Sequence, residues 1–199
     1  MALEVELKAR LHQPAHIETK AARLGRFGGE FFKEDIYFRR RGDSGRLPDD
    51  RFRLRREGDK ATVTFKQAIQ AGGLEVNDEV EFGVDEARAF FRFADRFGFE
   101  PFVVKRKKSR LYRVGRAQVE INQVTHLGHF AEIEIMCSAE ADVPIAKAEL
   151  LHLLMRLNLK EADLEPRRYI EMIQEAYPVQ YRFVSSSTSD WPFEEIACP

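Results

Sequence analysis

The sequence has few cysteines and no long apolar run. Its two cysteines among 199 residues, Cys137 and Cys198, lie far apart and match no metal-ligand or redox spacing. This usage excludes a disulfide framework and fits a reducing compartment. No apolar stretch approaches the roughly 20 residues that a membrane span requires, and the N-terminus lacks the basic and apolar regions of a signal peptide. The sequence therefore predicts a soluble, cytoplasmic protein with no membrane partner.

An excess of one charge sign is also missing. The formal net charge is −1, although 33% of the residues are charged and 44% are hydrophobic. This composition indicates a folded globular protein, and the near-zero net charge argues against nucleic acid as a partner. One stretch departs from the balance, because residues 103–116 hold seven Lys or Arg residues and no acid. Taken alone, such a stretch is typical of a nucleic-acid patch or a solvated strand.

Apolar spacing predicts four helices, which begin near proline or aspartate and end near glycine or proline. Eight further runs have the period-two pattern or the β-rich composition of strands. The sequence thus predicts an α+β fold whose sheet is largely antiparallel and closed or nearly closed, because closure removes exposed edges. The predicted helices cover residues 14–24, 86–97, 143–157 and 166–177, and the predicted strands cover residues 3–10, 34–40, 51–57, 61–67, 77–84, 102–108, 117–124 and 129–136.

The last part of the chain has no clear periodicity but contains Trp191 and Phe193. These rings either dock a tail on the domain or form a lid over a site. We therefore predict a single domain at residues 1–177 and a C-terminal tail at residues 178–199. Aromatic faces on the predicted helices are compatible with a homodimer and equally with burial in the core.

Most of the predicted strands carry their polar residues on one face. Alternate residues of a strand point to the same side, so Glu4, Glu6 and Lys8 share a face. For a single strand, this pattern is typical of a surface that faces water. In a closed sheet, however, one face of every strand points inward, and the charged faces would then line a channel. The other alternating polar positions are Arg51, Arg53 and Arg55; Thr62, Thr64 and Lys66; Glu79 and Glu81; and Glu132 and Glu134.

A charged channel requires compensating ligands, because an uncompensated buried charge is costly. Clustered carboxylates suit Mg²⁺ or Mn²⁺, which prefer oxygen ligands. The arginines and lysines require an anion. A metal-bound triphosphate meets both requirements, so we expect a divalent cation as cofactor and a nucleoside or inorganic triphosphate as substrate.

Several motifs in a fixed order resemble those of the CYTH superfamily, the triphosphate tunnel metalloenzymes. The chain opens with an E-x-E-x-K motif at Glu4, Glu6 and Lys8, and the last strand region reads VEINQVTHLGHFAEIEI at residues 119–135. The resemblance extends over residues 1–177 and implies an eight-stranded antiparallel tunnel with helices packed outside it. The motifs between these two are KEDIYF at 33–38, R-x-R at 53–55, TFK at 64–66, NDEVEF at 77–82 and FGFEP at 97–101.

The resemblance also implies roles for individual residues. The opening motif would supply the catalytic residues Glu4, Glu6 and Lys8. Arginine suits phosphate because its planar fork binds two oxygens, whereas lysine acts as a point charge. By position, the implied metal ligands are Glu4, Glu6, Glu132 and Glu134, and the implied substrate-binding residues are Lys8, Arg53, Arg55, Lys66, Lys105, Lys107 and Arg110.

Two positions depart from the family pattern. Asn122 stands where family members commonly have an aspartate, which leaves open whether one metal ion binds or two. The basic strand has two alternative alignments: Lys107 and Ser109 occupy the expected register, whereas Lys108 and Arg110 match after a shift of one residue. Because such a shift reverses the faces of a strand, the sequence does not assign this one.

The resemblance favours chemistry of the class IV adenylate cyclase type, which converts ATP to cyclic AMP and pyrophosphate. Two alternatives stay open. One is hydrolysis of thiamine triphosphate or inorganic tripolyphosphate, and the other is binding of a nucleotide or polyphosphate without turnover. His126 and His129 are expected to be loop residues rather than catalytic bases.

Overall fold

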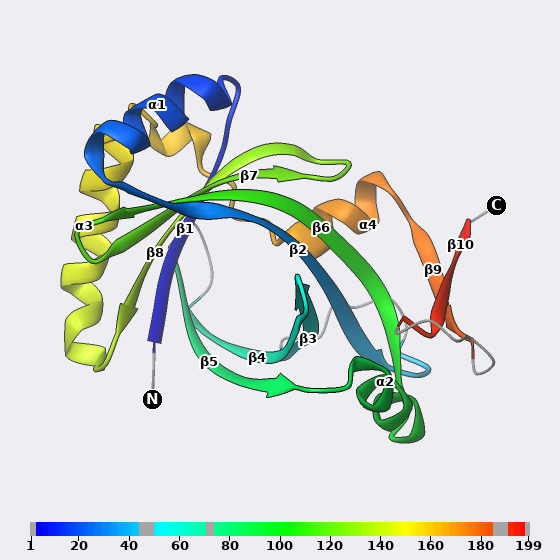
Figure 1. Ribbon diagram of the computed structural model, residues 1–199. Coiled ribbons are helices and arrows are strands. Elements are labelled where there is room, and N and C mark those ends of the chain that lie inside the picture. The colour runs from blue at the N-terminus through cyan, green and yellow to red at the C-terminus, as the bar shows by residue number, and fades with distance from the viewer. Residues whose placement is uncertain (1–2, 44–49, 71–73, 185–190, 198–199) are drawn as a thin grey trace. The chain divides into compact units, whose positions relative to one another are not determined.

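The computed structural model describes residues 3–43, 50–70, 74–184 and 191–197 (Figure 1). Eight strands form a closed barrel in the order β1-β5-β4-β3-β2-β6-β7-β8, which confirms the predicted α+β fold with a closed antiparallel sheet. The barrel strands are β1 (Leu3–Arg10), β2 (Arg26–Arg40), β3 (Asp50–Glu57), β4 (Lys60–Gln70), β5 (Glu75–Val84), β6 (Phe99–Val114), β7 (Ala117–Val124) and β8 (Gly128–Cys137), and the α-helices are α1 (Pro14–Leu24), α2 (Ala87–Arg96), α3 (Val143–Arg156) and α4 (Tyr169–Ala176).

Three strand regions differ from the prediction. Strand β2 begins directly after α1, because two consecutive glycines mask its alternating pattern in the sequence. The chain passes close to β6 there, and a Cβ atom at Gly25 would lie 2.3 Å from the carbonyl oxygen of Arg113. Strand β6 is also longer than predicted and continues to Val114. The tail forms an unpredicted hairpin of β9 (Val179–Phe183) and β10 (Phe193–Ala197).

The chain divides into two compact units, and each has its own apolar core. The first unit comprises Met1–Phe32, Gln67–Glu79 and Lys107–Arg167, and the second unit comprises Lys33–Lys66, Val80–Arg106 and Arg168–Pro199.

In the first unit, one face of β1 packs against helices α1 and α3. Leu3, Val5 and Leu7 are almost fully buried and share a core with apolar residues of both helices. These apolar residues occupy alternate positions, so they lie on one face of the strand. The other face of β1, which carries Glu4 and Lys8, therefore points to the inside of the barrel.

In the second unit, helix α2 packs against the strands through Phe91. This side chain is fully buried and clusters with Ile36, Phe38 and Leu54, which come from β2 and β3. These strand residues occupy alternate positions, so their neighbours Asp35 and Tyr37 lie on the opposite strand face. In both units, the face away from α1, α2 and α3 is the polar one. In the second unit, Tyr169 of α4 lies against this face, with its ring centroid 5.1 Å from Lys105 Nζ.

The aromatic residues of the tail dock on α2. The ring centroids of Trp191 and Phe193 lie 5.0 and 5.6 Å from the centroid of Phe91, and the guanidinium carbon of Arg56 lies 4.6 Å from the centroid of Trp191. Of the two interpretations of these rings, docking is therefore confirmed. Cys198 lies outside the described residues. The helices in the described ranges are all too short or too polar to cross a membrane.

Replacing Trp191 with alanine is expected to destabilise the second unit by about 1–2 kcal/mol, since an aromatic pair and a cation–π contact contribute roughly 0.5–1.5 and 0.5–1 kcal/mol. The hairpin should also become more sensitive to proteolysis. Chemical denaturation and limited proteolysis measure the two effects. Phe97→Ala is the matched control, because the Phe97 side chain is 63% exposed. Equal losses of stability in the two variants would contradict the docking.

Candidate functional site

Three carboxylates of the first unit converge on the inner face of the barrel. Glu4 and Glu6 lie on β1, and Glu134 lies on β8 directly opposite Glu6 in the antiparallel pair. Ligand oxygens of the three side chains lie within 4.8 Å of one another. Glu4 is almost fully buried, and the side-chain amide of Asn77 donates a hydrogen bond to it at 3.5 Å. Three carboxylates this close repel one another, so the group favours a cation.

This carboxylate group fits a small divalent cation. Mg²⁺ takes oxygen ligands at about 2.1 Å, so two oxygens on opposite sides of the ion lie about 4.2 Å apart. The three ligand oxygens all lie within 4.8 Å of one another, which is close to this limit. All three ligands are hard carboxylate oxygens, which suit Mg²⁺ and Mn²⁺ better than the softer metals that prefer nitrogen and sulfur. The first unit thus contains a candidate site for a divalent metal.

The fourth predicted metal ligand, Glu132, does not join this group. Its Oε2 accepts hydrogen bonds from Lys107 Nζ at 2.5 Å and from Asn122 Nδ2 at 2.9 Å. Lys107 Nζ also donates to Glu120 Oε2 at 2.7 Å. In the described part of the chain, Glu132 therefore belongs to a second cluster with Lys107, and the metal candidate is limited to the other three carboxylates.

Asn122 holds two neighbouring side chains in place. It is fully buried, and its Oδ1 accepts a hydrogen bond of 2.6 Å from Ser109 Oγ while its Nδ2 donates to Glu132. An aspartate could not donate to Glu132, because a carboxylate is an acceptor only. The amide at this position is therefore suited to its surroundings.

Replacing Asn122 with aspartate is expected to lower the free energy of unfolding by about 1–3 kcal/mol, because the change removes a buried hydrogen bond and places a second carboxylate against Glu132. Thermal and urea unfolding of the metal-free protein measure the loss. Gln123→Glu makes the same amide-to-carboxylate change at the next residue, which is exposed, and should cost far less. An Asn122→Asp protein as stable as the wild type would show that the Asn122 amide does not support Glu132.

Lys8 lies on the same strand face as the carboxylates. Its Cα is opposite that of Glu132 in the β1–β8 pair. The side chain is 9% exposed, and Nζ donates a hydrogen bond of 2.6 Å to the backbone carbonyl of Arg167. The structure thus places Lys8 on the predicted face. The hydrogen bond holds its ammonium group beside Arg167, the last residue of the first unit.

The second unit contains a cationic group built around one buried carboxylate. Asp35 on β2 is fully buried, and Arg55 donates to its two oxygens at 2.7 and 3.0 Å. Lys105 Nζ lies 2.8 Å from Asp35 Oδ2, and Arg53 Nη1 lies 3.5 Å from the same atom. One carboxylate on this strand face therefore lies among three cations.

The titration of Asp35 and Tyr37 reflects these neighbouring cations. Burial acts to raise the pKa of Asp35, but the charges of Arg55, Lys105 and Arg53 outweigh it and hold the pKa well below the ordinary value. Burial also acts to raise the pKa of the Tyr37 hydroxyl, and Lys105 and Arg53 again outweigh it, so this pKa is lowered. The surroundings thus stabilise negative charge strongly, as expected for an anion-binding face.

The structure resolves the two faces of the basic strand β6. Lys107 and Ser109 pair with Val124 and Asn122 of β7, so they lie on the polar inner face together with Lys105. Arg110 lies on the opposite face, where its guanidinium pairs with Glu18 and stands 5.3 Å from the Phe27 ring centroid. The structure does not bring Arg110 to the other predicted substrate-binding residues of its unit.

The remaining residues singled out from the sequence are Lys66, His126 and His129. Lys66 lies half-buried on the face of β4 that also carries Thr64, whose hydroxyl donates to Glu81 at 2.6 Å. His126 lies in the turn after β7 with a positive φ of 67°, as predicted for a loop residue. His129 instead lies in β8, within the strand predicted at residues 129–136, so it is not a loop residue.

Sequence reasoning missed the role of Asp35. The residue belongs to the KEDIYF motif, where it directly follows Glu34, and the sequence gives little sign of which of the two acids has buried charge partners. Its alternation with the buried Ile36 and Phe38 was the available signal, since it places Asp35 and Tyr37 on the face opposite the core.

Comparisons with known proteins give a consistent result. The family model described as the CYTH domain matches residues 2–169. A protein of Methanocaldococcus jannaschii named "Putative adenylate cyclase" is 25% identical over 171 residues, which cover 85% of this chain and 98% of that protein. "Adenylate cyclase CyaB" of Aeromonas hydrophila is 29% identical over 102 residues, 51% of this chain and 52% of that protein.

A solved structure is similar over the same region. The PH1012 protein of Pyrococcus horikoshii OT3 superposes with a TM-score of 0.74 at 30% identity, and the match covers 84% of this chain and 98% of that protein. This chain is thus about 30 residues longer than that relative. The hairpin of β9 and β10 follows residue 169, where the match to the family model ends.

Proposed function

The chain belongs to the CYTH domain family, and we propose that it is a metal-dependent enzyme that acts on a triphosphate. The observation that carries the proposal is the convergence of Glu4, Glu6 and Glu134 on one face of the first unit, with their oxygens within 4.8 Å. Polyphosphates are commonly bound as metal complexes, and carboxylates are the ligands that such metals prefer.

The side chains of this face suit both metal binding and phosphate binding. Glu4, Glu6 and Glu134 would hold the divalent ion. Lys8 and Lys107 share their face in the first unit, and their ammonium groups would bind phosphate oxygens. Lys107 is held in place for this by Glu120 and Glu132.

In the second unit, Arg53, Arg55 and Lys105 are the residues that we assign to phosphate, together with Lys66. Asp35 orients the two guanidinium groups and the ammonium group without neutralising all three. Because these cations are already in position, they bind phosphate oxygens without the reorganisation that water molecules would undergo.

A divalent ion, when bound, would neutralise phosphate charge and help to align the attacking and leaving oxygens. The residues themselves position the chain of phosphates, which is most of what phosphoryl chemistry demands of a protein. In a cyclase, the 3′-hydroxyl of ATP attacks the α-phosphorus and pyrophosphate leaves. In a hydrolase, water attacks the terminal phosphorus and phosphate leaves.

We favour the cyclase reaction, because two curated relatives at 25% and 29% identity carry adenylate cyclase names. The alternatives are hydrolysis of thiamine triphosphate or tripolyphosphate, and binding without turnover. Asn122 supports binding without turnover as an alternative, because this residue replaces a carboxylate typical of the family.

The test is a turnover assay of the purified protein with ATP, thiamine triphosphate or tripolyphosphate, each with Mg²⁺ or Mn²⁺. Cyclic AMP and pyrophosphate in equal amounts, lost on addition of EDTA, are the expected products from ATP. Release of phosphate alone would replace the cyclase with a hydrolase. Tight binding with no product from any substrate would overturn the enzymatic proposal.

A further inference from the structure

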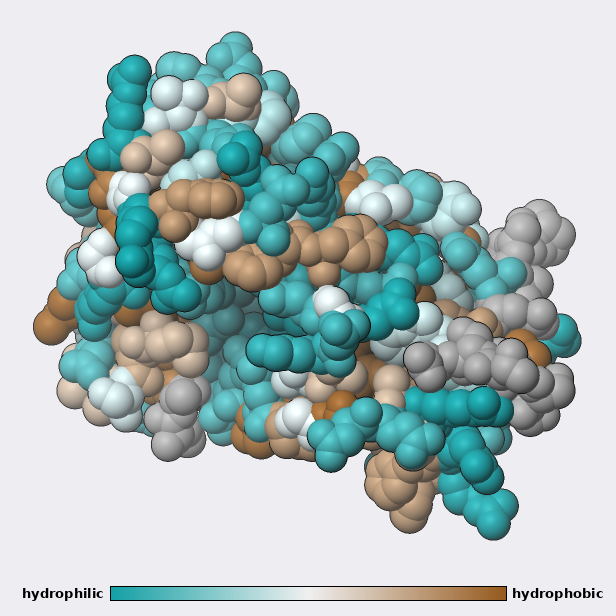
Figure 2. Space-filling model, viewed as in Figure 1, coloured by the Kyte–Doolittle hydropathy of each residue, from teal (hydrophilic) through white to brown (hydrophobic). Residues whose placement is uncertain are grey.

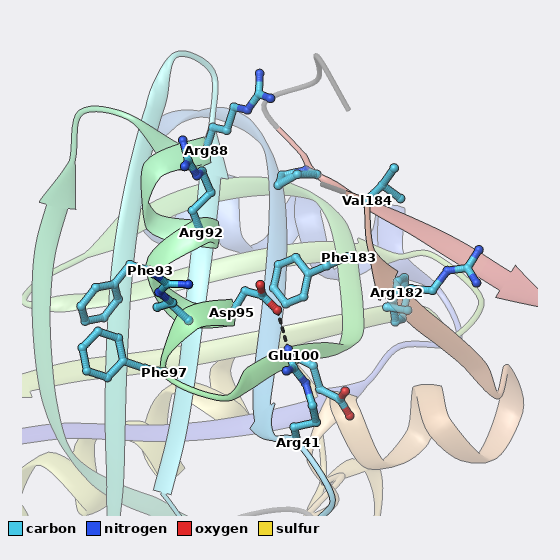
Figure 3. Close-up of a pocket in the computed structure, with 13 residues that line it drawn as sticks. Arg41, Arg88, Arg92, Phe93, Asp95, Phe97, Glu100, Arg182, Phe183 and Val184 are labelled. Atoms are coloured by element: carbon cyan, nitrogen blue, oxygen red, sulfur yellow. Dashed lines mark hydrogen bonds and ion pairs between the residues drawn. The ribbon is translucent and has the colours of Figure 1, made fainter. Parts of the chain in front are cut away.

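A pocket in the second unit lies outside the barrel, between helix α2 and the tail hairpin. It has a volume of about 990 Å³. Figure 3 shows Phe183 projecting from the hairpin toward α2, with Asp95 projecting from α2 toward Arg41. The hairpin wall lies beyond the residues that the family model matches, so this pocket is separate from the proposed triphosphate site.

Arginine dominates the charge of the pocket. Its lining contains five arginines and two carboxylates, and both carboxylates already have partners. Asp95 pairs with Arg41, and Glu100 pairs with Arg39 at 2.8 Å. The lining therefore offers no further acid to the arginines of α2.

Three of these arginines form a stripe along α2. Arg88, Arg92 and Arg96 are spaced four residues apart, so they lie on one side of the helix. No ion pair or hydrogen bond connects any of the three to a residue within the described ranges. Like charges at this spacing destabilise a helix. An unneutralised arginine stripe beside a pocket favours an anionic ligand, and phosphate suits the guanidinium fork best.

The hairpin contributes apolar side chains to the pocket, together with Tyr181 and Arg182. Phe183, Val184 and Pro192 line it opposite the arginines. Arg182 alternates with Phe183 along β9, and Figure 3 shows its guanidinium directed away from α2. The lining therefore suits a ligand that has a flat or apolar part as well as negative charge, whereas inorganic phosphate alone would not contact the apolar side chains.

The exposed rings Phe93 and Phe97 do not contribute to that wall. Figure 3 shows both on the side of α2 away from Phe183. Their centroids are 4.5 Å apart, and Figure 2 shows hydrophobic and strongly hydrophilic side chains next to one another over this helix.

From these observations we propose that the pocket binds a single nucleotide with two or three phosphates, without a metal ion. Arg88 and Arg92 hold the phosphates, Arg96 adds to the field, and the base packs against Phe183 and Pro192. The volume is that of a small-molecule site rather than of a track for a polymer. Guanidinium groups bind phosphate without a cation, so binding here persists in EDTA.

The experiment is an ATP titration of the whole protein in EDTA, followed by calorimetry and by the fluorescence of Trp191. This residue is the chain's single tryptophan and precedes Pro192 in the pocket wall. The double variant Arg88→Gln/Arg92→Gln is expected to weaken the titrated affinity by at least about tenfold, the loss typical of one charge-assisted contact. The control Arg23→Gln/Arg156→Gln removes the same charge from exposed positions of α1 and α3 and should leave the affinity unchanged.

Other results would overturn the proposal. Equal losses of ATP affinity in the two double variants would show that the affinity depends only on the protein's net charge. Tripolyphosphate binding as tightly as ATP would remove the role of the apolar wall, and preferential binding of a single-stranded oligonucleotide would point to nucleic acid instead. A titration with neither heat nor a fluorescence change would show that no nucleotide binds. The Arg88→Gln/Arg92→Gln variant changes only this pocket and no residue assigned to the triphosphate. Its loss of affinity, measured without metal or turnover, therefore reports on the pocket and not on the proposed triphosphate chemistry.

Discussion

Replacing Glu6 with glutamine is expected to lower metal-dependent turnover by about a hundredfold or more, a loss typical of removing one preorganised electrostatic contact. Glutamine keeps the shape of the side chain but removes its charge, so Glu4 and Glu134 would be left to hold the divalent ion. Initial rates over a range of Mg²⁺ and Mn²⁺ concentrations measure the effect. Calorimetric metal titration should show weaker binding in the same variant.

The matched control is Glu149→Gln, which makes the same chemical change in the first unit. Glu149 lies on α3 and forms an exposed pair with Arg116 at 2.9 Å. This variant should keep both its rate and its metal affinity. If Glu6→Gln also kept the wild-type rate at low metal concentration, the carboxylate group would not be the functional metal site.

Replacing Asp35 with asparagine is expected to destabilise the protein by about 3–5 kcal/mol, because the change leaves buried cations without their counter-charge. Asp35 is fully buried beside Arg55, Lys105 and Arg53. Urea denaturation at neutral pH measures the loss. Asp59→Asn serves as the control, since Asp59 is exposed in the turn between β3 and β4.

The pH dependence of stability provides a second measurement of the same group. The pKa of Asp35 is well below its ordinary value in the folded protein. Its stabilising contribution is therefore complete above the ordinary pKa, near 4, and is lost as the pH falls below that value toward the folded pKa. The wild type should lose more stability than Asp35→Asn between about pH 4 and pH 2. Parallel pH profiles would show that Asp35 does not carry the effect.

The pattern of the strands predicted the faces of β1 and β8 correctly. In both, apolar and charged residues alternate strictly, and a strand has only two faces. Within each strand, the charged residues occupy alternate positions and so share a face. Glu6 and Glu134 could therefore both be expected on the charged face of the sheet. The pairing that sets Glu6 opposite Glu134 could not be predicted, since it depends on the register between strands that are far apart in the chain.

Strand β6 shows the opposite case. Its basic residues occupy both parities, so the pattern offers no distinction between Lys107 and Lys108. Only the pairing with β7 and the packing against α1 assign Lys107 to the inner face and Arg110 to the outer face. Glu132 is similar, because its alternation with Glu134 predicts the face correctly but not the ion pair with Lys107 that separates it from the metal candidate.

The sequence by itself determined the class of fold, the four helices and the polar face of the opening strand, because these depend on local periodicity. The tertiary structure alone decided which charges meet. Asp35 lies among three cations, and the arginines of α2 line a pocket with the tail hairpin, because strands and helices distant in the chain pack together. Periodicity specifies the direction of a side chain, and only long-range packing specifies its partner.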